Sequence, residues 1–334
     1  MFNKERKNLL SVIISIYDYK FQQNLLAVLK SIRAQSLDVE IVLSEQGDCK
    51  KSVYKEIAKE FNAKYILTKP DFDRGKKVFN IGRVRNAGAL ASTGRYLYFS
   101  DADIFIYNKN YFNILLEKSI NSKIYNWYRP SMYRLSESTC NEFIKDYTNN
   151  ISIDILNIPD ICMVDYDKYT NMLRPISEGE YNKIILDQPF VCTKSEFEMI
   201  NREGVDLLNT DEFVWKARFH YGGTFCSFSN FYKAAGYCEL YYNWGLEDED
   251  FHCKLRAIGG IGKIDRIVPN KSILHFEHST KYNNNTYKRN IEIFKQRQML
   301  GVDEIIKLDK NNKESFIASY IQNNKDVLNS FIVN

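Results

Sequence analysis

The sequence predicts an α/β fold, with one domain built on a mainly parallel central sheet and helices on both faces. Over the first third of the chain, short β-branched runs alternate with amphipathic helical patterns. This alternation favours right-handed βαβ units, in which the crossover helices cover a parallel sheet. The 334 residues, 44% of them hydrophobic, suffice for one large core, and no repeat or low-complexity linker divides them.

The first elements follow from the spacing of apolar residues. Strands are expected at 10–16, 39–43, 65–67 and 96–99, and helices at 21–34, 53–61 and about 84–91. The last of these helices ends at Thr93-Gly94, and strand 96–99 leads directly into Ser100-Asp101-Ala102-Asp103. Ligands of open parallel sheets bind beyond the carboxyl ends of the strands, so this acidic segment is expected at the ligand-binding edge.

The middle of the chain is less regular. Residues 104–211 are rich in Tyr, Asn and Ser, and they show one helix start, at Thr193 with Glu196 as its capping partner. We expect the least generic part of the structure in this stretch.

Two further helices are expected after it. The first is capped at Ser229 and closed by Gly236, and the second opens at 247–250 and closes at 259–260. The apolar stripe of the second helix is formed by Phe251, Leu255 and Ile258. This stripe predicts that the acidic start of the helix is anchored to a core face.

Composition and charge exclude several classes of protein. The net charge is only +4, with 46 basic and 42 acidic residues mixed along the chain, so no basic face for nucleic acid stands out. The seven cysteines are scattered without Cys-x-x-Cys spacing and are expected to be reduced and structural. The N-terminal residues do not form a secretory signal, and no run approaches membrane-spanning length. We expect a cytoplasmic enzyme, with peripheral contact at the inner face of a membrane left open.

Asp101 and Asp103 are candidate metal ligands. They lie two residues apart just past a buried strand, so both carboxylates can approach one hard cation. Oxygen ligands of this kind suit Mg²⁺ or Mn²⁺ bridging a diphosphate. A solvated turn at a strand end explains the Asp-x-Asp pattern alone equally well.

His275 and His278 bracket Phe276-Glu277 after the strand-like residues 272–274 and are half of the four histidines. Imidazoles joined to one carboxylate favour a borderline metal such as Mn²⁺. The alternative is a pair of hydrogen-bonded structural histidines near a strand end, and only the presence of Asp103 favours the metal interpretation.

Four consecutive acids, Glu247 to Asp250, stand at a helix start, where the helix dipole stabilises negative charge. A solvated, well-capped terminus is the simpler explanation, and we assign Glu249 and Asp250 to it. Trp244-Gly245 just upstream favours function for the first two acids, because an aromatic ring beside a carboxylate base suits a sugar.

Three further segments could bind a phosphorylated ligand. Gly222-Gly223 allows a close backbone approach or simply a tight turn. Arg83 and Arg85 could reach diphosphate oxygens, or could be solvated residues on a helix face. Glu45 follows the second strand at the edge where a nucleoside would lie, although a turn is the simpler interpretation.

Taken in order, these segments resemble the GT-A glycosyltransferases, in the branch with the β-1,4-galactosyltransferases, bacterial chondroitin-type polymerases and related family 2 enzymes. The resemblance covers about 10–107 and 219–294. Its specific matches are Phe79-Asn80 through Asn86, Ser100 to Asp103, Gly222-Gly223, and Trp244 to Asp248, with the histidine segment as a weaker fifth. The resemblance implies a Rossmann-like GT-A domain.

The resemblance also implies a metal site for Mn²⁺ or Mg²⁺. Asp103 corresponds to the direct metal ligand, Asp101 supports it and the donor, and His278 corresponds to the family's metal histidine. His275 falls where the galactosyltransferases carry a methionine ligand.

The same similarity implies that Asp248 is the catalytic base and that Glu247 contacts the acceptor or donor sugar. The residues that it implies for the donor are Glu45, Phe79, Arg83, Arg85, Asp101, His220, Gly222, Gly223 and Trp244. Leu246 replaces a glycine of the galactosyltransferase pattern, and His220-Tyr221 replaces its Tyr-Phe pair. These departures leave the donor sugar open, and His220 is expected to admit N-acetylated sugars as well as plain hexoses.

The implied activity is inverting, metal-dependent transfer of a hexose or N-acetylhexosamine from a UDP-sugar to a glycan, glycolipid or glycoprotein hydroxyl, in surface polysaccharide or glycoconjugate synthesis. A non-catalytic sugar-binding protein on the same scaffold is the alternative. A nucleotidyltransferase is disfavoured, because residues 15–19 read Ser-Ile-Tyr-Asp-Tyr and not a glycine-rich basic loop.

The expected organisation is a GT-A domain at 1–300 followed by a helical extension at 301–334. Within the domain, 1–107 bind nucleotide, 108–210 form a variable insert, and 211–300 hold the acceptor and catalytic part.

Overall fold

The computed structural model describes most of the chain. The described residues are 6–17, 22–47, 52–121, 125–129, 133–135, 140–141, 143–145, 161–167, 172–176, 190–193, 222–243, 245–258, 261–264, 273–276, 284–312 and 315–321. The helix predicted to start at Thr193 falls on residues outside this set, and Thr193 itself is the last residue of strand β12 (Phe190–Thr193).

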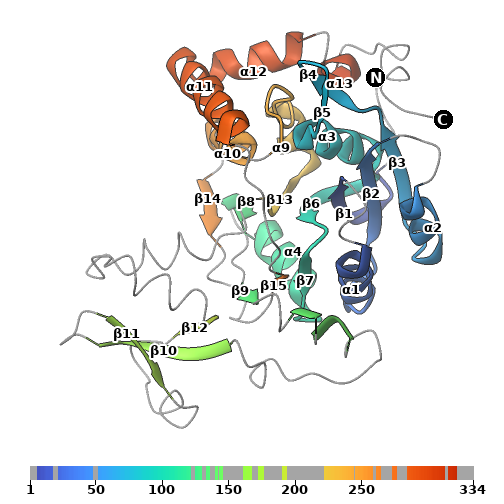
Figure 1. Cartoon of the computed structure of the whole chain (residues 1–334), viewed down its shortest axis with the longest axis vertical. Coiled ribbons are helices and arrows are strands. Elements are labelled where there is room, and N and C mark those ends of the chain that lie inside the picture. Colours follow the sequence, from blue (N-terminus) through green and yellow to red (C-terminus); the bar gives the residue numbers. More distant parts are fainter. Residues whose placement is uncertain are drawn as a thin grey trace.

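Within the described residues, seven strands form one central sheet (Figure 1). In spatial order they are β14 (Ile261–Ile264), β8 (Tyr125–Arg129), β13 (Thr224–Ser227), β6 (Gly94–Asp101), β1 (Asn8–Ile16), β2 (Glu40–Gln46) and β3 (Lys64–Thr68). β1 is parallel to β2 and β6, β2 to β3, and β14 to β8, whereas β13 is antiparallel to both of its neighbours. The prediction of a mainly parallel sheet is confirmed.

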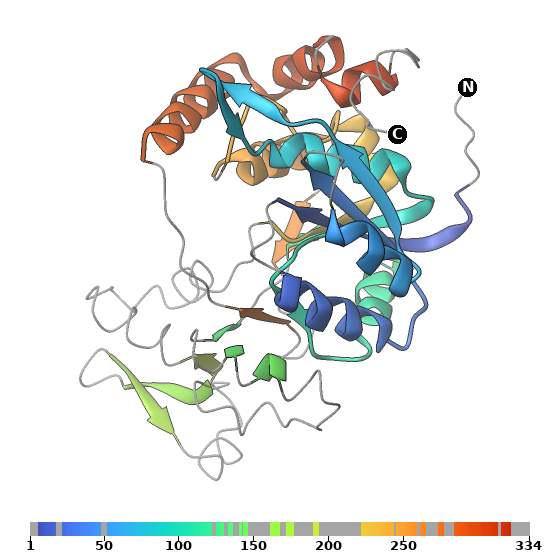
Figure 2. The ribbon, with the colours of Figure 1, turned by 45° about the vertical axis from the view of Figure 1, so that its right-hand side comes forward.

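Helices cover both faces of this sheet. Along the first half of the chain they are α1 (Gln22–Arg33), α2 (Val53–Glu60), α3 (Ile81–Ala91) and α4 (Tyr111–Asn121). In Figure 2, α1 (dark blue) and α3 (teal) lie on opposite sides of the strands. This arrangement is the one expected when parallel strands are joined by right-handed crossovers.

The alternation of side chains along β1 explains the two layers. Leu10, Val12 and Ile14 pack on the face covered by α1, α2 and α4, while Ile13 packs on the opposite face with Phe99 and residues of α3. Neighbouring residues of a strand point to opposite faces, so a continuous apolar run is the signature of a strand buried on both sides.

Three smaller sheets complete the strands of the described residues. Their members are β4 (Asp71–Asp73) with β5 (Lys76–Val78); β7 (Ile104–Ile106), β15 (Ile273–Phe276) and β9 (Tyr133–Leu135); and β11 (Met172–Ile176), β10 (Ile161–Asp167) and β12 (Phe190–Thr193). β15 runs antiparallel to β7 with His275 opposite Ile104. This pairing brings His275 beside the acidic segment that ends β6.

The remaining helices come from the second half of the chain. They are α9 (Phe228–Lys233), α10 (Glu247–Ala257), α11 (Asn284–Leu300), α12 (Val302–Asn311) and α13 (Phe316–Ile321). The stripe predicted for α10 is confirmed, because Phe251 and Leu255 are buried in the core on the α3 side of the sheet. The cap of α9 is Ser227, whose side chain accepts a hydrogen bond from the Asn230 N–H, and not Ser229 as predicted.

A buried group of charges joins α10 to the two helices that follow it. Arg297 of α11 donates to Asp250 of α10 (Nε to Oδ1, 2.6 Å) and to Asp309 of α12 (Nη2 to Oδ2, 2.8 Å). Lys254 completes the group with a contact of 2.6 Å to Asp309. Asp250 is therefore a buried ion-pair partner, and the prediction that it only contributes capping charge is wrong. The sequence does not predict this role, because Arg297, which binds the Asp250 carboxylate most directly, lies 47 residues further along the chain.

Part of the middle of the chain belongs to the central sheet. β8, from the segment predicted to be the variable insert, is a strand of the central sheet. None of the described helices has the length and apolar character needed to cross a membrane.

Candidate active site at the carboxyl edge of the sheet

Arg85 brings together three acids that the sequence singles out. Its guanidinium contacts the carboxylates of Asp248 (2.5 Å), Asp101 (3.1 Å) and Glu247 (3.6 Å). The arginine side chain is 1% exposed, whereas that of Asp101 is 32% exposed. The positive charge of the cluster, on Arg85, is therefore buried, whereas one of its carboxylates, that of Asp101, reaches solvent.

Each member of the cluster is held by a different element. Asp101 ends β6, Glu247 and Asp248 open α10, and Arg85 projects from α3. α3 begins at Asn80, whose side chain accepts a hydrogen bond from the Arg83 N–H, and it is buried along most of its length. A helix buried on nearly every side must pair any charge that it carries, because unpaired charge is costly away from water.

Burial and neighbouring charges set the ionisation of this cluster. Burial lowers the pKa of Arg85, but Asp248, Tyr237, Asp101 and Glu247 raise it more, so the guanidinium stays charged. Burial raises the pKa of the Asp248 carboxyl well above its ordinary value; Arg85 opposes this shift and Glu247 adds to it. A buried carboxylate that binds a proton more readily than usual has the property required of a general base.

The chain enters α10 through an unusual backbone. Gly245 has φ +106° and Leu246, the N-cap residue, has φ +74° and makes no side-chain cap. The Gly245 N–H instead donates to Glu247 Oε2 at 3.1 Å. A Cβ on Gly245 would lie 2.8 Å from the Tyr287 ring, so glycine is required here for space as well as for backbone conformation.

Asp103 and His275 form a second pair at the same edge. Asp103 follows β6, and the distance from its Oδ2 to His275 Nε2 is 3.7 Å. Its backbone carbonyl accepts a hydrogen bond of 2.9 Å from the Phe276 N–H, which fixes the two segments side by side. A carboxylate oxygen and an imidazole nitrogen this close can share one divalent cation, so this donor set fits Mn²⁺ or Mg²⁺.

Phe79 lies beside the end of β1, and Glu45 is the second-last residue of β2, which continues past the strand end predicted at residue 43 and into the turn expected there. The Phe79 ring stacks on Tyr17 with centroids 4.7 Å apart and an interplanar angle of 17°. The Glu45 carboxylate accepts hydrogen bonds from the Ser52 hydroxyl and, at 2.6 Å, from the Tyr65 hydroxyl. Both residues are at the edge where the sequence places them, and Glu45 is engaged with neighbouring side chains.

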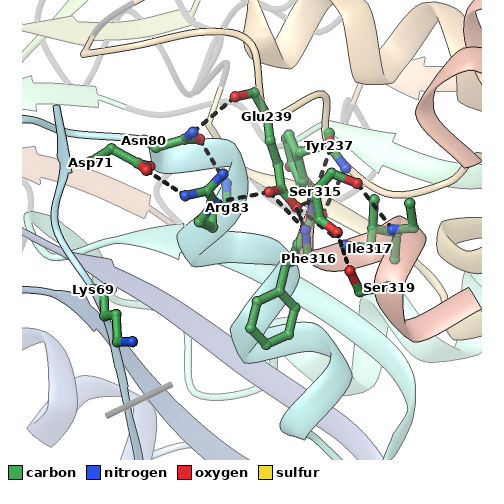
Figure 3. Close-up of polar contacts among 12 residues, drawn as sticks. Lys69, Asp71, Asn80, Arg83, Tyr237, Glu239, Ser315, Phe316, Ile317 and Ser319 are labelled. Carbon is green, nitrogen blue, oxygen red and sulfur yellow. Dashed lines mark hydrogen bonds and ion pairs between the residues drawn. The ribbon is translucent and has the colours of Figure 1, made fainter. Parts of the chain in front are cut away.

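Arg83 does not join the Arg85 cluster. It pairs with Asp71 of β4 and, through Nε at 3.0 Å, with Glu239 (Figure 3). Glu239 also accepts hydrogen bonds of 2.9 Å from the backbone N–H of Phe316 and from Asn86 Nδ2. Arg83 thus ties α3 to the hairpin of β4 and β5 and, through Glu239, to helix α13.

Five predicted residues remain to be placed. Gly222 and Gly223 are buried, and because Thr224 lies opposite Phe99 in the antiparallel pair of β13 and β6, they run beside the end of β6. Trp244, His220 and His278 lie outside the described residues.

A second acidic group, formed by Cys238, Asp250 and Asp309, has ligand atoms close enough to hold a metal ion. The positions around it are taken by Arg297 and Lys254, which contact both carboxylates. This group is therefore a structural ion-pair network.

The sequence does not predict three buried roles: the pairing of Arg85 with Asp101 and Asp248, the acceptance of backbone N–H groups by Glu239, and the hydrogen bonds of Asn290 to the carbonyls of Tyr242 and Gly245. The available signal for Arg85 was its position in a helix of small and apolar residues that has no acid in its first turn. Such a helix is expected to be buried, and a buried arginine needs acidic partners from elsewhere in the chain. Asn290 and Glu239 carry no comparable local signal.

Comparison with known proteins bears on the first part of the chain. Residues 11–137 match the sequence model of the family described as glycosyl transferase family 2. The match contains Arg85, Asp101 and Asp103, whereas Asp248 and His275 lie beyond it. No curated protein sequence matches the chain.

Some solved structures resemble the chain loosely. S. aureus TarS 1–349 is 12% identical, with a TM-score of 0.45, and the match covers 94% of this chain and 71% of that chain. The same fragment in complex with UDP-GlcNAc is 13% identical, with a TM-score of 0.45 and coverages of 94% and 72%. The catalytic domain of Drosophila β1,4-galactosyltransferase 7, in complex with xylobiose, is 12% identical, with a TM-score of 0.41 and coverages of 87% and 80%.

Proposed function

We propose that this chain, a family 2-like glycosyltransferase of the GT-A fold, transfers a hexose or N-acetylhexosamine from a UDP-sugar to a hydroxyl acceptor with inversion at the anomeric carbon. The observation that carries this proposal is the convergence of Asp248, Glu247 and Asp101 on Arg85 at the carboxyl edge of the sheet. Glycans, glycolipids and glycoproteins are the acceptor classes that we consider.

In this proposal Asp248 is the general base. Its carboxylate removes the proton of the acceptor hydroxyl as the oxygen attacks the anomeric carbon from the face opposite UDP. Arg85 holds Asp248 through the 2.5 Å contact and keeps its orientation fixed. Glu247, tied back to the Gly245 N–H, contacts the sugar beside it and stabilises the loop that carries Trp244.

The donor would lie along the edge formed by β1, β2 and β6. The stacked rings of Phe79 and Tyr17 offer an aromatic surface for a uracil base. Gly222 and Gly223 allow the backbone to approach the sugar, and His220 remains the proposed determinant of the group at the second carbon of the sugar. The boundaries proposed from the sequence, 1–300 for the catalytic domain and 301–334 for the extension, stay part of this proposal.

Asp103 and His275, with Asp101 and His278, would hold the divalent cation, which supplies charge neutralisation to the departing diphosphate. Carboxylate and imidazole ligands together favour Mn²⁺. Asp103→Ala is expected to lose Mn²⁺-dependent UDP binding, which calorimetry measures independently of turnover.

The test of the function is UDP release from a panel of UDP-hexoses and UDP-N-acetylhexosamines with Mn²⁺, with and without oligosaccharide acceptors. Acceptor-stimulated UDP release that excess EDTA abolishes supports the proposal. Donor binding without release, or with release that Asp248→Asn leaves intact, would instead favour the alternative of a non-catalytic sugar-binding protein.

A further inference from the structure

We propose that Asn290 of α11 is a positioning residue that holds the loop 242–246 and thereby sets the placement of Asp248. The inference rests on the proposed function of Asp248 as base. Asn290 lies 42 positions after Asp248 in the sequence and outside the specific motif matches of the resemblance, although the resemblance as a whole extends to about residue 294.

One buried amide ties both ends of the loop. Asn290 is fully buried, and its Nδ2 donates to the carbonyl oxygens of Tyr242 (3.0 Å) and Gly245 (3.2 Å). Its Oδ1 accepts a longer hydrogen bond, 3.5 Å, from the Tyr242 N–H. A single side chain thus satisfies three backbone groups on either side of position 244.

The loop needs such a restraint. Asn243, Gly245 and Leu246 all have positive φ, at +57°, +106° and +74°. Positive φ is costly for residues other than glycine, so the conformation persists only where the surroundings enforce it. Without the amide of Asn290, the partly buried carbonyls of Tyr242 and Gly245 would lose this donor, and the loop could relax toward more favourable backbone conformations.

The rest of the same helical turn supports this role. Asn243 Nδ2 donates to Thr286 Oγ1 at 3.4 Å, and the Tyr287 ring fills the space that a side chain at Gly245 would need. Arg289 donates to the Leu240 carbonyl at 2.9 Å. The loop is therefore fitted along α11 at several points, with Asn290 at the centre.

On its other side the loop contacts the start of the donor edge. The Asn243 N–H donates to the Phe79 carbonyl at 2.5 Å, and Asn243 Oδ1 accepts from the Phe79 N–H at 3.0 Å. α11 is itself fixed to α10 by Arg297 and Asp250. Asp248 therefore lies between two points that one helix restrains, the loop before it and the buried aspartate after it.

From this geometry we expect loss of the Asn290 amide to affect kcat more than UDP affinity. A small displacement of a general base lowers the rate of the chemical step steeply, and about 1 Å can cost on the order of 100-fold. In the proposed function the nucleotide lies at the ends of β1 and β2, whereas the Asn290 amide binds Tyr242 and Gly245. The loop reaches that edge through the two backbone groups of Phe79, and Asn243, not Asn290, binds these. Loss of the amide donor should therefore lower kcat by about 10- to 100-fold and leave UDP affinity within roughly 2-fold.

The experiment compares Asn290→Asp with Asn290→Ala and the wild-type chain. Aspartate keeps the size of asparagine and its acceptor oxygen but cannot donate to the two carbonyls. Glu292→Gln is the matched control, because Glu292 lies on the same helix, is exposed, and pairs only at the surface with Lys295 among the described residues. The measurements are hydrogen exchange of peptides covering 240–246, UDP affinity, kcat and acceptor KM.

Faster exchange in 240–246, a fall in kcat and unchanged UDP affinity in Asn290→Asp are expected, with Glu292→Gln like wild type. Unchanged exchange and kcat in a folded Asn290→Asp overturn the inference, and so does a parallel loss of UDP affinity. If neither variant at position 290 folds, Thr286→Val is measured instead, because it removes the acceptor of the Asn243 side chain. It should change loop exchange and kcat in the same direction but by less. If the wild-type chain transfers no sugar and Asn290→Asp still speeds exchange in 240–246, the proposed function is wrong but the restraint of the loop by Asn290 stands.

Discussion

A single buried guanidinium faces three carboxylates at the proposed active site. Arg85 neutralises one negative charge, so the site with Asp101, Glu247 and Asp248 ionised keeps an excess of negative charge close to Asp103. Such a site attracts cations, and a carboxylate next to other carboxylates is harder to ionise. The residues of this edge therefore affect one another's charge, and substitutions here should change chemistry before they change the fold.

Asp248→Asn should abolish sugar transfer while UDP affinity stays nearly unchanged, because the base acts on the acceptor and not on the nucleotide. A loss of about 10²–10⁴-fold in kcat is expected for removal of a general base. Turnover and UDP titration measured on the same preparation check this. Glu249→Gln, one residue along the helix, is the control and should behave like wild type in both. Collapse of UDP binding in Asp248→Asn would mean that Asp248 is a donor ligand or a structural residue.

The pH dependence of kcat/KM should show an acid limb above the range of ordinary aspartates, because burial raises the pKa of Asp248. The ionised carboxylate is the active form, so activity is present above this pKa and is lost as pH falls through it. Arg85 opposes the shift, so Arg85→Gln should move the limb to higher pH. A pH profile from about 4 to 9 tests both statements. A limb that stays in place in Arg85→Gln would contradict this account of the electrostatics.

At this scale the sequence singles out Asp101, Asp103 and Asp248 as candidate site residues, because they stand at a strand end and a helix start. The sequence does not predict which arginine pairs with which of these acids. Arg83 and Arg85 are indistinguishable by pattern, yet Arg83 pairs with Asp71 and Glu239, and Arg85 pairs with Asp101 and Asp248. That choice depends on which side of α3 meets α10, which only the packed structure decides.

At the scale of elements, α10 carries both the proposed base and the charge group that anchors it. Its first residues face the active site, and Asp250, fully buried, is bound by Arg297 of α11. Removing one member of a buried ion pair leaves its partner charged and uncompensated, which is much more costly than the loss of an exposed pair.

Asp250→Asn is therefore expected to lower the free energy of unfolding by about 3–5 kcal/mol, the usual effect of breaking a buried pair. Glu249→Gln should change it by less than about 1 kcal/mol, because Glu249 is only partly buried. Urea unfolding of both variants at the same pH compares them directly. Equal stability of the two variants would show that Arg297 is satisfied by Asp309 alone.

The individual elements are well predicted where the periodicity is strong. Strand 10–16 and helix 53–61 appear within two residues of the predicted bounds, as β1 and α2. The α9 cap was misplaced because Ser227 and Ser229 satisfy the same rule, and the choice depends on where β13 ends. The short hairpin of β4 and β5 is missed, because its three-residue strands are too short to show alternation.

At the scale of the whole molecule, the C-terminal helices are part of the same structure as the donor edge. Phe316 and Ile317 pack in the core with residues of α3 and α10, and their N–H groups donate to the Glu239 carboxylate. The sequence predicts a helical extension after residue 300 but not its contacts, since Glu239 and Phe316 are 77 positions apart.

A chain ending at residue 312 should be markedly less stable than one ending at 321. The shorter chain lacks the apolar contacts of Phe316 and Ile317 and leaves the buried Glu239 carboxylate without two N–H donors, a loss of several kcal/mol. The longer chain keeps both and is the matched control. Thermal unfolding and resistance to protease measure the difference. Equal melting temperatures would show that α13 contributes nothing to the stability of the domain.

The position of Glu239 also determines when the protein can finish folding as it is made. One of its donors, Asn86, precedes it by 153 residues, and another, the Phe316 N–H, follows it by 77. At a synthesis rate of about 5–20 residues per second, Phe316 is added roughly 4–15 seconds after Glu239. During that interval the carboxylate has only its earlier partners, and α11, which binds the loop before Asp248, is itself still being added. The proposed nucleotide edge can therefore form early on the ribosome, whereas Asp248, the proposed base, takes its final place only after α11 has been made.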